Sequence, residues 1–226
     1  FPEHFIKLVK ASSKQLSESL FLLDNLAELR KPKETADFFT NLNLSEKEDA
    51  VNELKNRIAN HTTEDSLAIC ILDSGIQKLH PLLTDFVPDN NLFSYKPDDW
   101  GFHDGWPNGG HGTGMAGIAL YGDLTQAMAS TNNIHIFHQL ESVKILNNKE
   151  PNEPKLYGAV TIEAANYPVI LAPHRPRIYC MAVTDKSQAY FGRPSSWSSA
   201  IDKIIFGGDD INLDKQLFLV SGGNVH

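Results

Sequence analysis

The chain has little of several features that would place it in a specialised class. Its 226 residues include only two cysteines, Cys70 and Cys180, which are too few for a disulfide framework. Both lie in apolar runs, LAICIL and IYCMAV, so we expect two free thiols in the core. No apolar run approaches the roughly 20 residues that span a bilayer, and we therefore expect no membrane partner.

Positive charge is also scarce. Twenty Lys and Arg residues face 28 Asp and Glu residues, for a formal net charge of −8. Phosphate binding needs a basic face, so we expect no nucleic-acid partner. A hydrophobic content of 41% is ordinary for a globular protein, and no charged-then-apolar leader precedes residue 15. With so few cysteines, these features favour a cytoplasmic location.

Residues 1–64 contain no glycine and read as a helical N-terminal segment. Apolar residues recur there at helical spacing in two stretches. They are Leu16, Leu20, Leu23 and Leu26 in the first, and Val51, Leu54 and Ile58 in the second. Ser45 followed by Glu48 predicts a capping box before the second stretch. We expect two or three helices whose role is packing or partner contact.

Residues 65–226 read as an α/β domain. Short apolar runs at 66–72, 141–146, 177–183 and 217–223 predict buried parallel strands. Helical patterns at 112–120, 157–166 and 196–206 alternate with them, and residues 86–110 predict a loop. This alternation indicates a doubly wound, mainly parallel sheet.

Three polar side chains follow the expected strands or open an expected helix. Asp73 ends the first strand, His111 begins a Gly-rich helix start, and Asn224 follows the last strand. In an open parallel sheet, ligands bind beyond the carboxyl ends of the strands. A carboxylate, an imidazole and an amide at this edge make up the polar set for acyl transfer, namely an orienting acid, a general base and an oxyanion donor.

These residues stand in motifs that resemble those of subtilisin-like serine peptidases. The motifs are D-S-G at 73–75, H-G-T-x-x-A-G at 111–117 and G-N at 223–224, in the family's chain order. The resemblance implies that His111 is the general base, that Asp73 orients it, and that Asn224 helps to bind the oxyanion. It also implies a serine endopeptidase whose partner is a polypeptide substrate.

The resemblance further implies where that substrate binds. The backbone of Met181, Ala182 and Val183 would pair with an extended substrate, and Ser221, Gly222 and Gly223 would form one wall of a pocket. Residues 147–156 would form the opposite rail, where Glu150 and Glu153 hint at basic substrate residues. No cofactor is expected. Leu82 follows His80-Pro81, where many secreted relatives place a calcium-binding aspartate.

The chain departs from the family pattern in one main respect. The family's nucleophile lies in G-T-S-x-A, which occurs nowhere in the 226 residues, and only Val225 and His226 follow Asn224. We therefore expect a truncated or processed chain that is inactive alone and needs a serine-bearing segment, in the same polypeptide or a separate one. Two rivals remain: a non-catalytic interaction protein that keeps the fold, and a metal hydrolase using His103, Asp104 and His111.

Overall fold

The computed structural model describes residues 7, 9–18, 28–30, 36–107, 110–185, 193–206 and 216–223. The chain divides into two units, Phe1–Glu34 and Thr35–His226. The described part of the first unit contains one short helix, α1 (Ser13–Glu18), and residues 20, 23 and 26 of the predicted helical stretch lie outside the described residues. Among the described residues, no helix is both long and apolar enough to cross a membrane.

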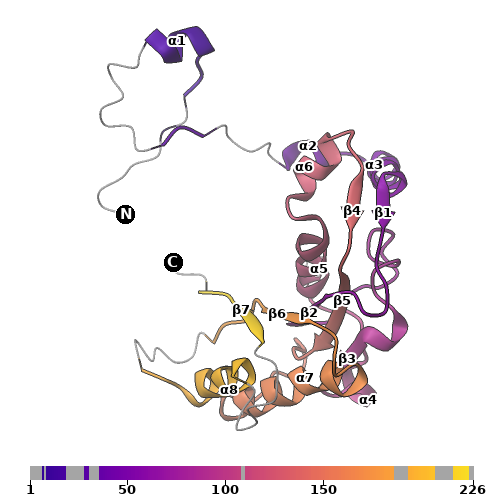
Figure 1. The fold of residues 1–226 in the computed structure, drawn as a ribbon, viewed down its shortest axis with the longest axis vertical. Coiled ribbons are helices and arrows are strands. Elements are labelled where there is room, and N and C mark those ends of the chain that lie inside the picture. Colours follow the sequence, from indigo (N-terminus) through magenta and orange to yellow (C-terminus); the bar gives the residue numbers. More distant parts are fainter. Residues whose placement is uncertain are drawn as a thin grey trace. The chain divides into compact units, whose positions relative to one another are not determined.

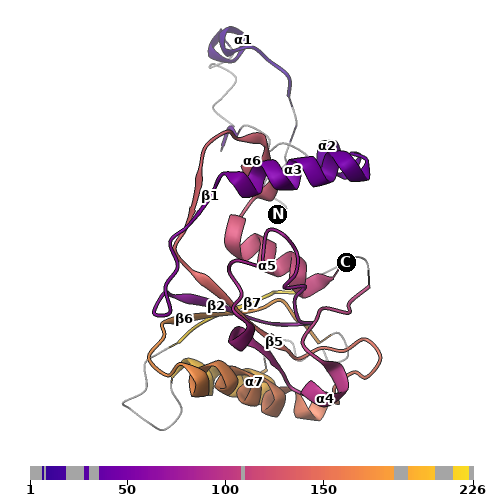
Figure 2. The same cartoon turned by 90° about the vertical axis from the view of Figure 1, so that its right-hand side faces the viewer.

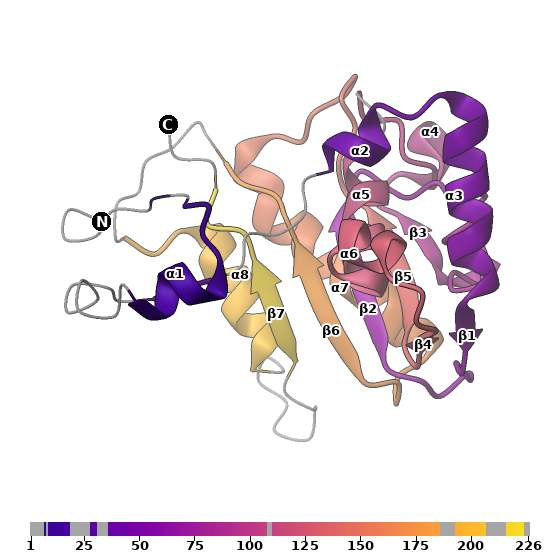
Figure 3. The ribbon, with the colours of Figure 1, turned by 90° about the horizontal axis from the view of Figure 1, so that it is seen from above.

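A five-stranded parallel sheet organises the second unit (Figure 1). Its strands, in spatial order, are β3 (Leu92–Ser94), β5 (Gln139–Lys144), β2 (Ala68–Asp73), β6 (Arg177–Met181) and β7 (Leu217–Val220). Figure 3 shows β2, β6 and β7 side by side. All four predicted apolar runs form strands of this sheet, and the central ones, β5, β2 and β6, are apolar because central parallel strands are covered on both faces.

Helices cover both faces of the sheet, which confirms the predicted α/β doubly wound class. Figure 2 shows α5 (His111–Tyr121) on one side of β2 and α7 (Tyr157–Leu171) on the other. Helix α8 (Ser196–Ile205) packs against α7. The two helices approach closely at Gly158, where an added Cβ would lie 3.1 Å from the carbonyl oxygen of Ser196.

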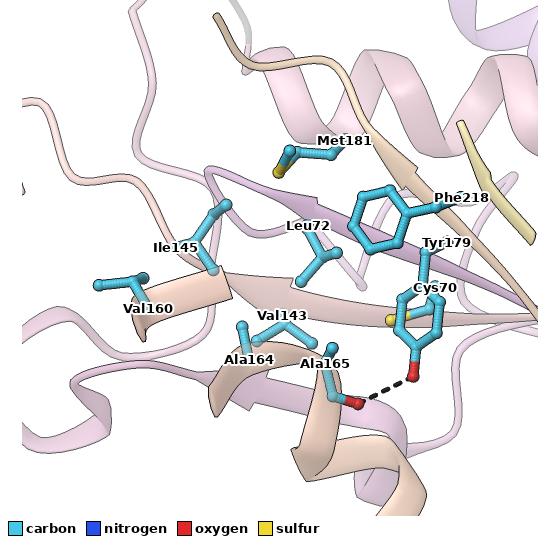
Figure 4. Packing of buried hydrophobic residues seen from close by; sticks show 10 residues of the cluster. All are labelled: Cys70, Leu72, Val143, Ile145, Val160, Ala164, Ala165, Tyr179, Met181 and Phe218. Atoms are coloured by element: carbon cyan, nitrogen blue, oxygen red, sulfur yellow. Dashed lines mark hydrogen bonds between the residues drawn. The ribbon is translucent and has the colours of Figure 1, made fainter. Parts of the chain in front are cut away.

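Two apolar cores follow from this layering. One lies under α7 and α8 and is drawn in Figure 4. Its members are Cys70, Leu72, Val143, Ile145, Val160, Ala164, Ala165, Tyr179, Met181 and Phe218. The other lies under α5 and includes Ile71, Ala116 and Leu140. Consecutive β2 residues therefore enter opposite cores, as the two-residue period of a strand requires.

A smaller two-stranded parallel sheet joins β1 (Ile58–Asn60) to β4 (Ile134–Ile136). The prediction that Ile58 extends the second helix is wrong, because α3 (Leu44–Asn56) ends before it and Ile58 pairs with Ile134. The Arg57 guanidinium, whose Nη1 donates to the Asn132 carbonyl at 2.7 Å, holds this junction. A contact distant in sequence thus overrides the local helical spacing.

The predicted capping box is also displaced. Asn43 caps α3: its side chain accepts a hydrogen bond from Glu46 N at 3.0 Å, and its own N–H donates to the Glu46 carboxylate at 2.8 Å. Ser45 and Glu48 lie inside the helix instead. Asn43 and Glu46 have the same three-residue spacing, and Asn43 has the extended backbone that a cap needs.

The remaining elements are short. They are α2 (Asp37–Thr40), η2 (Asp89–Asn91), α4 (Pro97–Trp100), α6 (Leu124–Ala129) and η3 (Pro154–Leu156). Three of the elements, η2, β3 and α4, fall in the stretch 86–110 that was predicted as loop. Helix α7 continues through Pro168 and is five residues longer than predicted. The predicted domain boundary at 64/65 stays a prediction, although Leu54 of α3 is fully buried within the second unit.

Candidate active site

Asp73 is the last residue of β2 and is fully buried. Its Oδ1 atom accepts a hydrogen bond from the backbone N–H of Ser74 at 2.7 Å, and the Ser74 hydroxyl oxygen lies 3.1 Å from the same atom. Its backbone carbonyl accepts from the N–H groups of Ile145 and Leu146, which extend β5. The end of the central strand thus holds this carboxylate in one position at the carboxyl edge.

His111 is the first residue of α5, and its Nδ1 atom lies 2.9 Å from each carboxylate oxygen of Asp73. The distance lies within the hydrogen-bonding range expected of a triad pair. The imidazole is 46% exposed, whereas the Asp73 side chain is not exposed at all. One ring nitrogen therefore contacts the buried acid while part of the ring remains accessible.

Glycines make this approach possible. A Cβ at Gly112 would lie 2.2 Å from the Gly75 carbonyl oxygen, and a Cβ at Gly75 would lie 2.4 Å from the Phe102 carbonyl oxygen. Gly75 also has a φ of 90°, which residues with side chains rarely adopt. The glycines of D-S-G and H-G-T thus bring the end of β2 and the start of α5 into contact.

The structure adds residues that the sequence did not single out for catalysis. Asp104 is buried, and its carboxylate accepts hydrogen bonds from Ser74, Trp106 and Thr113. The only sequence signal was its position in a polar stretch before His111, which suggested a metal ligand. Because protein donors occupy both of its oxygens, the metal-hydrolase rival loses its central ligand. No group of three or more His, Cys, Asp or Glu residues suited to a metal occurs within the described part of the chain.

A buried lysine contacts the segment that leads from α4 to Asp104. Lys144, the last residue of β5, donates hydrogen bonds from Nζ to the carbonyl oxygens of Trp100 at 3.0 Å and His103 at 2.6 Å. Burial lowers the pKa of the Lys144 ammonium, and the nearby negative charge of Asp104 opposes that shift. The lysine thus ties the segment before Asp104 to the sheet.

An apolar pocket opens at the carboxyl edge of the sheet, between the extensions of β5 and β6. Its lining comprises Trp106, Ile145, Leu146, Asn147, Pro151, Asn152, Tyr157, Val160, Thr161, Val183, Thr184 and Trp197. Trp106 connects it to the polar cluster, since its backbone N–H donates to Asp104. The pocket thus lies between the two segments that were predicted to flank a substrate.

The predicted substrate-binding residues divide into three groups. Met181 belongs to β6: its side chain is buried, and its carbonyl accepts a hydrogen bond from Ser221 N at 3.2 Å, which leaves that carbonyl engaged. Ala182 and Val183 extend beyond the paired part of the strand and are partly exposed. The exposed segment of Ser221, Gly222 and Gly223 follows β7, with Gly223 beside Thr184. Asn224 lies outside the described residues.

Two further expectations can be compared with the contacts. The hint of basic specificity has no support, because Glu150 is paired with Lys96 and accepts a bond from the Trp100 indole, and Glu153 is paired with Lys155.

The expectation for the cysteines is confirmed: both are free thiols. Burial and the nearby Asp73 carboxylate raise the pKa of the Cys180 thiol, which disfavours its reactive thiolate form.

The family comparison agrees with the geometry. The model of the subtilase family matches residues 64–226, which is most of the chain. The chain therefore belongs to the subtilase family, a family of serine peptidases. A search of curated proteins and a search of solved structures found no match.

Proposed function

We propose that this chain supplies the acid, the base and the substrate rails of a subtilisin-like serine endopeptidase, and that its nucleophilic serine comes from a segment outside these 226 residues. The observation that carries the proposal is the contact of 2.9 Å between His111 Nδ1 and the buried Asp73 carboxylate, with the imidazole half exposed. None of the serines present lies in the G-T-S-x-A context of the family's nucleophile.

The contact with Asp73 determines which ring nitrogen of His111 carries the hydrogen. An ionised carboxylate only accepts hydrogen bonds, so His111 Nδ1 carries the hydrogen and Nε2 of the neutral ring keeps its lone pair. Nε2 can then take a proton from a serine hydroxyl and later return it to the leaving amine. Asp73 holds the ring orientation and stabilises the imidazolium that forms between the two steps.

The substrate in this proposal is an extended polypeptide. Ala182 and Val183 would pair with its backbone, and residues 147–156 would flank its other side. The pocket between them is lined mainly by apolar and aromatic side chains, including Tyr157 and Trp197. It would therefore accept an apolar substrate side chain near the scissile bond. Asn224 would donate a hydrogen bond to the oxyanion.

The surface of β7 is consistent with a missing segment. Leu217, Leu219 and Val220 are each about half exposed, at 54%, 53% and 48%. Leu217 and Leu219 share one face of the strand and Val220 lies on the other, so β7 offers apolar side chains for contact on both faces. We place the serine-bearing segment in the same polypeptide or in a partner chain that packs near this strand.

Two preparations test the proposal: the 226-residue chain alone, and the same chain with the segment that follows it in its gene. A fluorophosphonate probe, which labels activated serines, should leave the first unlabelled and label the second. The second should also cleave peptides, and His111→Ala should abolish both signals.

A second candidate function is a non-catalytic binding protein that uses the same pocket. It would be favoured if the extended, folded protein bound peptides without labelling or cleavage. Cleavage by the 226-residue chain alone with a requirement for His111 would instead show that the nucleophile is already present.

A further inference from the structure

Asp104 belongs to the segment between α4 and α5 and is only 5% exposed, yet it carries a carboxylate. Its Oδ1 atom accepts hydrogen bonds from the Ser74 hydroxyl at 2.9 Å and from Trp106 N at 3.0 Å. Its Oδ2 atom accepts from Thr113 N at 2.8 Å and from the Thr113 hydroxyl at 2.7 Å. Such a group is retained inside a protein only when its acceptor sites are satisfied, as they are here.

The partners of Asp104 flank the candidate catalytic pair. Ser74 is the residue after Asp73, and its hydroxyl also accepts a hydrogen bond from Gly112 N at 3.0 Å. Thr113 follows His111 by two residues and lies in the first turn of α5. One carboxylate therefore links the residue after Asp73, at the end of β2, to the first turn of α5, which begins at His111.

The segment that carries Asp104 is itself held in place. The Gln77 side chain donates to the Asp104 carbonyl at 2.7 Å, and Lys144 holds the neighbouring His103 carbonyl. Space is also restricted: a Cβ at Gly110 would lie 2.4 Å from Asp104 Oδ2. Because Asp104 is fixed from both directions, a change in its side chain would be transmitted to Ser74 and Thr113.

We propose that Asp104 is a positioning residue, which sets the separation and orientation of Asp73 and His111 by clamping Ser74 and Thr113. It acts through these neighbours and does not contact the reacting atoms. The inference rests on the proposed function for its kinetic consequence, and on geometry alone for the clamp.

A carboxylate suits this position for a specific reason. Each of its oxygens faces a backbone N–H, from Trp106 on one side and Thr113 on the other. An asparagine has one oxygen and one NH₂ group, so in either orientation one backbone N–H would face another donor. Asp104→Asn therefore keeps the size of the side chain and breaks the clamp on one side.

The kinetic test uses the protein that carries its serine segment. We expect Asp104→Asn to lower kcat by about 10- to 100-fold, the size of effect that small misplacements of catalytic groups cause, with KM changed less than about twofold. Asp98→Asn is the matched control, because Asp98 is an exposed acid on α4, shortly before the segment that carries Asp104. It should retain the parent kcat.

A milder pair of variants guards against a folding defect. Thr113→Val removes the hydroxyl that donates to Asp104 and accepts from Gln77 N, and keeps the shape of the side chain, whereas Thr113→Ser keeps the hydroxyl and both bonds. We expect the valine variant to lose about 3- to 10-fold in kcat and the serine variant to stay near the parent. Equal kcat values for the two variants would count against the clamp, whatever the stability of Asp104→Asn.

Proton NMR separates this inference from the proposed function. The Nδ1 proton of His111, assigned by its absence in His111→Ala, reports the contact with Asp73 without any need for turnover. We expect its resonance to shift or broaden in Asp104→Asn and to be unchanged in Asp98→Asn. If the protein never cleaves peptides but this shift is seen, the proposed function fails and the positioning role stands. A folded Asp104→Asn protein with the parent resonance and the parent kcat would overturn the inference.

Discussion

Buried charged side chains lie at both ends of the central strands, and the exposure of their partners differs between the two ends. In the amino half, Glu141 of β5 is fully buried and forms ion pairs with Arg175 at 2.8 Å and Arg177 at 2.7 Å. Arg177 also donates to the carbonyl oxygens of Pro168 and Ala172 at the end of α7. At the carboxyl edge, Asp73 is equally buried, but its histidine partner is half exposed.

The difference indicates separate purposes. In the amino-half cluster the Glu141 carboxylate is paired with two guanidinium groups whose side chains are 9% and 1% exposed, so the cluster holds β5, β6 and α7 together. At the carboxyl edge the Asp73 and Asp104 carboxylates are buried and hydrogen-bonded, whereas the imidazole that pairs with Asp73 is 46% exposed. A site that is to react needs such an accessible group on a rigid support.

The largest expected effect concerns the carboxyl edge. In the protein that carries its serine, His111→Ala should lower kcat by about 10⁶-fold, the order of magnitude that loss of the triad histidine causes in subtilisin. Steady-state peptide hydrolysis measures it. Stability should suffer less than in the Glu141 variant below, because Asp73 keeps its hydrogen bond from the Ser74 backbone N–H. A loss of activity explained entirely by unfolding would break the comparison.

The amino-half cluster should show the opposite pattern. Glu141→Gln leaves Arg175 and Arg177 without a counter-charge, and breaking such a buried pair costs about 3 to 5 kcal/mol. Denaturant unfolding measures this loss, with the exposed Glu48→Gln in α3 as the matched control. The folded fraction should keep the parent kcat. A variant with parent stability but reduced kcat would instead assign the cluster to catalysis.

High pH should lower the free energy of unfolding through two groups of the apolar core under α7 and α8. Burial raises the pKa of the Tyr179 phenol, whose hydroxyl donates to the Ala165 carbonyl at 2.8 Å, and it raises the pKa of the Cys70 thiol (Figure 4). In the unfolded chain these groups ionise near their ordinary values of 10.0 and 9.0, while the folded protein still holds both protons. The folded state then binds more protons, so stability is full below those values and falls as pH rises through them.

The expected phenol contribution is about 1 kcal/mol lost between about pH 9 and about pH 11. Unfolding titrations of the parent and of Tyr179→Phe measure it, and the phenylalanine variant should show a shallower decline. The Lys144 ammonium contributes with the opposite sign, because burial lowers its pKa. Identical pH profiles for the two proteins would show that Tyr179 does not couple folding to pH.

The smallest effect concerns the pocket. Val183→Thr replaces a methyl group by a hydroxyl at nearly constant volume, which should weaken binding of an apolar substrate side chain by about 1 kcal/mol, or about fivefold in KM. Kinetics with peptides that differ at one apolar residue measure it. Ile170→Thr on the outer face of α7, where Ile170 is 78% exposed, is the control and should leave KM unchanged. Equal KM values for Val183→Thr and the parent would place the substrate elsewhere.

Local patterns were sufficient for the sheet and for the central pair. The apolar runs that became β2, β5 and β6 could be recognised because buried parallel strands need apolar residues on both faces, and the outer strand β7 carries the same apolar pattern although it is half exposed. Asp73 and His111 were found because each lies within a short motif whose glycines permit the close approach. The same reasoning failed at two places. Ile58 leaves the helix because it pairs with Ile134 in a strand, and the cap of α3 is Asn43 because Asn43–Glu46 and Ser45–Glu48 have the same spacing and the sequence does not distinguish them.

The sequence alone therefore determined the fold class, the family and the two residues that meet at the edge of the sheet, since hydrophobic period and glycine spacing act over a few neighbouring positions. Only the tertiary structure decided that Asp104 joins Ser74 to Thr113, that Glu141 lies between two arginines, and that Met181 is engaged within the sheet. Those contacts join residues about 30 or more positions apart, with the exception of the nearby Thr113. The hydrogen-bond partner of a buried charge can come from any part of the chain, so a local sequence pattern does not predict it.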